Sequence, residues 1–98
     1  MKATLLVRRR IVFAEKAFAE LVLWQLHKPL DRSSHPFKYR LAYVVGGICV
    51  VRYDNELTKG DHRHFGNKES AYTFTTPEQL VADFQKDIAR WNRENSDS

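Results

Sequence analysis

The chain has 98 residues, of which 43% are hydrophobic, with a formal net charge of +4 and one cysteine. This length fits one small domain over residues 1–98. The positive net charge favours a polyanion or an acidic protein as partner. A second copy of the chain would also stabilise so small a domain. The lone cysteine excludes an internal disulfide and a cysteine-based zinc site, and it fits a reducing compartment. We expect neither a signal peptide nor a bilayer-spanning segment, so the sequence favours a cytoplasmic protein without a membrane partner.

The N-terminal part of the chain predicts a strand and then a segment with two interpretations. Residues Ala3 to Val12 are rich in Leu, Val, Ile and Thr, which is typical of a strand. The run Arg8-Arg9-Arg10 interrupts it, so we expect an edge strand or a bend there, where the like charges either blunt unwanted strand pairing or bind an anion. Residues Phe13 to His27 fit both a helix and an alternating strand, and periodicity alone does not decide between them.

The middle of the chain predicts a β-hairpin. Residues Phe37 to Val45 alternate in a strand pattern, and Ile48 to Tyr53 continue it after a Gly46-Gly47 turn, where glycine tolerates positive φ. Residues equally far from the turn face each other across the hairpin. We therefore expect Arg40 to lie opposite Tyr53, within one register step.

The C-terminal part predicts a short strand followed by a helix. Residues Ala71 to Thr75 fit the strand, while Thr76 and Pro77 fit the N-cap and the first position of the helix. The helix carries apolar side chains at helical spacing, which predict one stripe that packs on a sheet. These side chains are Leu80, Phe84, Ile88 and Trp91.

The stretch from Tyr53 to His64 is unusually dense in titratable side chains. It contains three acids, two histidines, a lysine and an arginine around Gly60. Because unpaired buried charge costs several kcal/mol per ion, we expect this stretch to leave the end of a strand as a polar loop, where functional residues are common. The alternative is a solvated turn with chance histidines. The other two histidines, His27 and His35, flank an earlier loop and are expected on its surface.

Four motifs occur in a set order along the chain. They are Phe37-Lys38-Tyr39-Arg40, Tyr53-Asp54-Asn55-Glu56, Lys59-Gly60-Asp61-His62-Arg63-His64 and, in the C-terminal helix, Leu80-Val81-Ala82-Asp83-Phe84. In this order, and over nearly the whole chain, they resemble the TumE family of bacterial type II toxin–antitoxin proteins. The resemblance implies a single TumE-like toxin domain that a helix-turn-helix antitoxin of the TumA kind neutralises by direct binding. Ribonuclease activity follows only by analogy with other small toxins.

The resemblance also bears on the ambiguous residues 13–27. Relatives often carry Asp-Gly where this chain has Glu15-Lys16, and Asp-Gly implies a hairpin turn with a strand on each side. We therefore expect a hairpin here. The complete expectation is an α+β fold: a single small domain with an antiparallel sheet of about five strands and a C-terminal helix packed on one face.

The two histidines of the polar stretch are candidates for the base and the acid of metal-independent RNA cleavage. An imidazole titrates near neutral pH, and in an extended segment His62 and His64 point to the same side. Arginine and lysine match the charge of phosphate, and a tyrosine can stack on a base or donate a hydrogen bond. We assign His62, His64, Asp61 and Glu56 to catalysis, and Arg40, Tyr53, Lys59, Arg63 and Lys38 to RNA binding.

Three alternatives remain for the same residues. The first is a non-catalytic toxin or nucleic-acid-binding protein that inhibits by binding a cellular target. The second is a structural polar cluster, in which Asp61 pairs with Arg40 and His62 bonds a backbone carbonyl. The third is a mixed nitrogen and oxygen metal site of Asp61, His62, His64 and Glu56. Adjacent Asp61 and His62 rarely bind one ion, and the helical His-x-x-x-His spacing is absent, so we expect neither a metal ion nor a cofactor.

Overall fold

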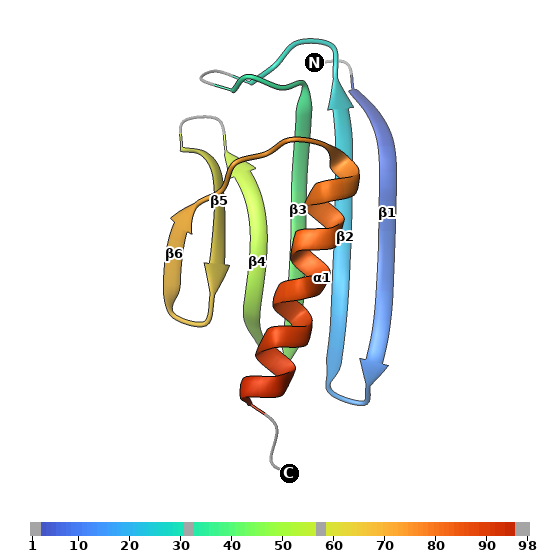
Figure 1. Cartoon of the computed structure of the whole chain (residues 1–98). Coiled ribbons are helices and arrows are strands. Elements are labelled where there is room, and N and C mark those ends of the chain that lie inside the picture. The colour runs from blue at the N-terminus through green and yellow to red at the C-terminus, as the bar shows by residue number, and fades with distance from the viewer. Residues whose placement is uncertain (1–2, 31–32, 57–58, 96–98) are drawn as a thin grey trace.

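The computed structural model describes residues 3–30, 33–56 and 59–95, which form six strands and one helix. The elements are β1 (Ala3–Ala14), β2 (Ala17–Leu26), β3 (Phe37–Val45), β4 (Ile48–Glu56), β5 (Gly60–Phe65), β6 (Lys68–Ala71) and α1 (Pro77–Glu94). The strands form one antiparallel sheet in sequence order, and α1 lies across one face of it (Figure 1). The expected α+β fold is confirmed, with six strands where about five were expected.

The additional strand is β5, in the stretch that was expected to be a polar loop. Its residues pair with β4 on one side and with β6 on the other. The strand predicted at Ala71 to Thr75 is wrong, because β6 already ends at Ala71. The tight turn explains this: Gly66 has a φ of 58°, so the chain reverses at once and Phe65 pairs with Lys68.

Residues Ala17–Leu26 form a strand rather than a helix, as the predicted hairpin requires. Ala19, Leu21 and Leu23 are buried in the core beneath α1, while Glu20 between them is exposed. Burial of one side of this alternating pattern outweighs the helix propensity of the individual residues. β1 pairs only with β2, so the arginine run lies on an edge strand.

Two local predictions are confirmed at the level of single residues. The turn at Gly46-Gly47 uses positive φ at both positions, and it places Arg40 opposite Asp54, one register step from Tyr53. α1 begins where expected, because the side chain of Thr76 accepts a backbone N–H of the first turn at 3.0 Å.

The two faces of the sheet differ because α1 covers only one of them. Between α1 and the sheet lies the core, formed by Ala19, Leu21, Leu23, Tyr39, Leu41, Tyr43, Val51, Tyr53, Leu80, Phe84 and Ile88. We call this side the helix face. The side turned away from α1 we call the open face, and its residues include Arg8, Arg10, Phe18, Trp24, Lys38, Arg40, Arg52, Asp54, His62, His64 and Glu69.

Two tyrosines of the helix face hold α1 through its carboxylates. The hydroxyl of Tyr53 donates to Oδ2 of Asp87, and that of Tyr72 donates to Oδ2 of Asp83, both at 2.6 Å. Nη2 of Arg63 lies 3.1 Å from the same oxygen of Asp87. Burial first, and then the hydrogen bond to a carboxylate, raises the pKa of Tyr53 and of Tyr72 above the usual range.

We expect the free energy of unfolding to fall as pH rises above about 10. An unfolded tyrosine ionises there, whereas the raised pKa keeps Tyr53 protonated in the fold. The stabilisation from Tyr53 is therefore complete below pH about 10 and is lost above it, at about 1.4 kcal/mol per pH unit. Urea denaturation on both sides of this pH measures how steeply the free energy of unfolding falls with pH. Tyr53→Phe should make this fall less steep by the contribution of one tyrosine. An unchanged slope in that variant would contradict the role given to its hydroxyl.

Candidate functional site

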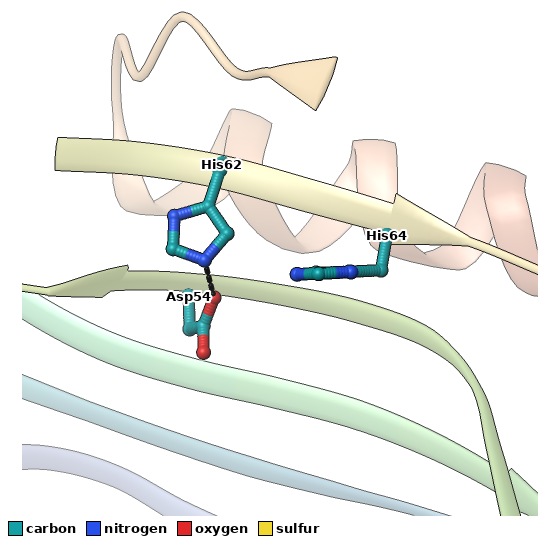
Figure 2. Close-up of side chains that lie close together, drawn as sticks. All are labelled: Asp54, His62 and His64. Carbon is teal, nitrogen blue, oxygen red and sulfur yellow. Dashed lines mark ion pairs between the residues drawn. The ribbon is translucent and has the colours of Figure 1, made fainter. Parts of the chain in front are cut away.

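Strand alternation divides the polar stretch between the two faces of the sheet. His62 and His64 lie on the open face of β5, where both side chains extend toward β4 (Figure 2). Asp61 and Arg63, which alternate with them, lie on the helix face. The structure therefore brings the two imidazoles together and separates them from their neighbours in sequence.

Asp54 on β4 and His62 on β5 are cross-strand partners and form a buried pair. Nε2 of His62 lies 2.8 Å from Oδ1 of Asp54, and Nδ1 lies 3.1 Å from the carbonyl oxygen of Gly60. Only 5% of His62 and 8% of Asp54 is exposed. Both ring nitrogens of His62 therefore face oxygen atoms.

His64 is the more accessible imidazole, with 26% of its side chain exposed. Nη2 of Arg52 lies 2.8 Å from Nε2 of His64. A guanidinium can only donate, so Nε2 accepts and the neutral ring carries its proton on Nδ1. Oε2 of Glu69 lies 3.6 Å from Nε2, and the two imidazole centroids are 5.3 Å apart.

A shallow groove of about 420 Å³ lies beside His62. It is lined by Lys59, Asp61, His62, Glu69, Ser70 and Ala71. The lining carries charges of both signs, Lys59 against Asp61 and Glu69, and of the two imidazoles only His62 lines the groove.

The other residues predicted for the open side lie around this pair. Arg40 is exposed on β3, opposite Asp54. Nζ of Lys38 donates to the carbonyl oxygen of Asn55 at 2.8 Å, which holds its side chain against β4. Glu56 and Lys59 are exposed, at the end of β4 and just before β5.

Three predicted site residues lie on the opposite face from the imidazoles. Arg63 and Tyr53 bind Asp87 of α1, as described above. Oδ2 of Asp61 accepts the hydroxyl of Tyr39 at 2.6 Å and lies 2.8 Å from a ring nitrogen of another histidine. None of the three contacts the imidazole pair, because adjacent residues of a strand point to opposite faces.

The histidine bound to Asp61 is His35, and its expected position on a loop surface is wrong. Only 8% of His35 is exposed, and its ring stacks on Phe74 at a centroid distance of 4.0 Å. Asp61 thus pairs with His35 rather than with Arg40. Burial, and then the hydrogen bond to Asp61, raises the pKa of Tyr39 above its usual range. These contacts make Asp61 a residue that ties the loop before β3 to β5.

Sequence reasoning did not assign two residues of the site, Asp54 and Arg52. A hairpin closed by Gly60 would have revealed them, because pairing from that glycine places Asp54 opposite His62 and Arg52 opposite His64. The stretch was instead interpreted as a loop, and a loop has no register. The signal was the positive φ that a glycine permits, which is 74° at Gly60.

The same side chains form a group that can hold a metal ion. Ligand atoms of Asp54, His62 and His64 lie within 4.8 Å of one another. This set differs from the one considered from sequence, since Asp61 lies on the other face and Glu56 is exposed at the end of its strand.

Comparison with known proteins identifies one family. A family model described as Toxin TumE matches residues 2–92 of the chain. Neither a curated protein nor a solved structure matches. Within the described residues, no helix combines the length and the apolar character needed to cross a bilayer.

We expect Asp61→Ala to lower the stability of the fold. The change leaves the buried hydroxyl of Tyr39 and the ring nitrogen of His35 without their partner, which costs about 1–3 kcal/mol. Urea denaturation measures the loss. The matched control is Glu69→Ala, an exposed acid on β6, with an expected change within about 0.5 kcal/mol. Equal stability of the two variants would contradict the structural role of Asp61.

Proposed function

The chain belongs to the TumE toxin family, and from this premise we propose that it is the RNA-cleaving toxin of a bacterial type II toxin–antitoxin pair. The proposed reaction takes place on the open face and uses no metal ion. A helix-turn-helix antitoxin would neutralise the protein by direct binding. The observation that carries the proposal is the pair of imidazoles, 5.3 Å apart, on the uncovered side of the sheet beside Arg52.

His64 is the proposed base and His62 the proposed acid. Arg52 occupies Nε2 of His64 in the free protein, and a phosphate that draws the guanidinium to itself leaves this lone pair to accept the proton of the 2′-hydroxyl. The 2′-oxygen then attacks phosphorus, and the bond from phosphorus to the 5′-oxygen breaks. His62, whose Nε2 lies 2.8 Å from Oδ1 of Asp54, would act in its protonated form and give its proton to the leaving oxygen. The products are a 2′,3′-cyclic phosphate and a 5′-hydroxyl.

Cations and aromatic rings extend across the open face from β1 to β4. They are Arg8, Arg10, Phe18, Trp24, Lys38, Arg40 and Arg52. Neighbouring strands lie about 4.8 Å apart, so the path from β1 to the imidazoles on β5 covers about 19 Å. Single-stranded RNA binds to such surfaces through phosphate contacts with cations and base stacking on rings. The width of this surface supports an extended RNA as the ligand.

The outer edge strand β1 is the surface at which we expect a protein partner such as the antitoxin to bind. Its exposed apolar side chains are Leu5, Leu6, Val12 and Phe13, of which 40–68% is accessible. Between them, the run Arg8-Arg9-Arg10 forms no ion pair with any described residue. An acidic and apolar segment of the antitoxin would complement this edge by adding a strand to it. A second copy of the chain suits the edge less, because antiparallel β1 strands would place two arginine runs side by side.

The burial of His62 favours a second candidate function, in which the open face binds RNA or another cellular target without chemistry. A general acid must come within hydrogen-bond distance of its substrate, and only 5% of His62 is exposed. In this case the groove beside His62 would serve for binding alone.

We expect the purified, antitoxin-free protein to cleave single-stranded RNA in the presence of a chelator. Product analysis should find 2′,3′-cyclic phosphate ends. His64→Ala removes the base and should slow cleavage by about 10²–10⁴-fold. The matched control is His27→Ala, an exposed histidine that follows β2, which should cleave at the rate of the unchanged protein.

The same variants, expressed in growing cells, separate the two candidate functions. Loss of both RNA cleavage and growth inhibition in His64→Ala supports the enzyme. Full growth inhibition by His64→Ala, with no cleavage by the unchanged protein, would instead support target binding without chemistry.

A further inference from the structure

We propose that Asp54, His62 and His64 form a binding site for a divalent transition-metal ion, with Zn²⁺ as the best fit, and that the bound ion switches off the imidazole pair. The first part stands on the geometry alone. The second part rests on the proposed function, because it assumes that both imidazoles act on RNA.

The sheet brings the three ligands together through its register. Asp54 and His62 are directly opposite each other on β4 and β5, and His64 follows two residues later on the same side of β5 (Figure 2). Their ligand atoms lie within 4.8 Å of one another. Two imidazoles and one carboxylate with an open fourth position form a ligand set that Zn²⁺ uses, and imidazole suits Ni²⁺ and Cu²⁺ as well.

Three buried polar atoms around this site lack an aligned hydrogen bond, and two of them are ligand atoms: Nε of Arg52, Oδ1 of Asp54 and Nε2 of His62. Oδ1 of Asp54 and Nε2 of His62 lie 2.8 Å apart, yet neither makes an aligned hydrogen bond in the described structure. More than nine-tenths of each residue is buried, and buried polar groups without a partner are rare because they are costly. A cation bound to both atoms would satisfy them, and this is the independent sign of a ligand.

The surroundings of His62 are those of a metal ligand. Its Nδ1 lies 3.1 Å from the carbonyl oxygen of Gly60, so the ring is held by the nitrogen that points away from the site. A metal-binding histidine usually bonds a backbone carbonyl or a carboxylate in this way, which fixes the orientation of the ring and makes the other nitrogen a better ligand.

Arg52 is the competitor of the metal ion. Its Nη2 lies 2.8 Å from Nε2 of His64, and its Nε lies 3.4 Å from Oδ2 of Asp54. The guanidinium therefore provides the positive charge to which these ligands are bound in the free protein. A metal ion has to displace it, so removal of this side chain should tighten metal binding. This expectation distinguishes a site at these three ligands from adventitious binding elsewhere.

An ion bound to both imidazoles would prevent the proposed chemistry. His64 could no longer accept a proton through Nε2, and His62 could no longer donate one. The consequence would be a toxin that is inhibited by Zn²⁺ and reactivated by a chelator.

The test measures metal binding to the full chain in the absence of RNA. Chelator-treated protein is titrated with Zn²⁺ by calorimetry and with Co²⁺ by visible absorption, which reports the coordination geometry. We expect one ion per chain. His64→Gln and Asp54→Asn should each weaken binding at least about 10-fold, Arg52→Gln should tighten it several-fold, and the exposed control His27→Gln should leave it unchanged.

Two outcomes would overturn the metal site: no binding of either ion to the unchanged protein, or equal affinity in His64→Gln, Asp54→Asn and the unchanged protein. Circular dichroism verifies that each variant is folded. Failure of the proposed function has a different result: the site binds Zn²⁺ with the expected effects of substitution, but the chelated protein cleaves no RNA. Cleavage that persists with Zn²⁺ bound would overturn the inhibitory role.

Discussion

The pairing of β5 with β4 decides which chemistry each face of the sheet carries. β5 begins at Gly60, which has a positive φ and pairs with Glu56, and this register sets Asp54 opposite His62. A shift of one residue would move both imidazoles to the helix face and bring Asp61 to the open face. The register thus does more than hold two strands together. It gathers two histidines, a carboxylate and Arg52 on the face that α1 leaves uncovered, and it directs Asp61 and Arg63 to the helix face.

The helix face gives this register its stability. Asp61 is bound to Tyr39 and His35, and Arg63 and Tyr53 are bound to Asp87. The alternate residues of the charged stretch are therefore anchored, which holds the intervening histidines in place on the other side. Two sets of residues that looked like one site in the sequence therefore lie on opposite faces: Asp61 and Arg63 bind other elements of the fold, and His62 and His64 belong to the proposed site.

Much of the fold could be predicted because its signals are local. The Gly46-Gly47 turn between alternating segments and the Thr76-Pro77 helix start each depend on a few neighbouring residues. The site could be predicted only in part, since His62 and His64 are visible in the sequence but Asp54 becomes their partner through strand pairing. β5 itself was missed because its side chains are charged, and their burial is stabilised by partners on other elements that no local pattern indicates.

Binding of RNA around His62 and His64 can be measured directly by NMR, through titration of the isotope-labelled protein with a short single-stranded RNA. We expect chemical-shift changes at the amides of β4 and β5 and at the side chains of His64 and Arg52, while the exposed side of α1 stays unchanged. Changes confined to α1, or no change at saturating RNA, would contradict a role of the open face in RNA recognition.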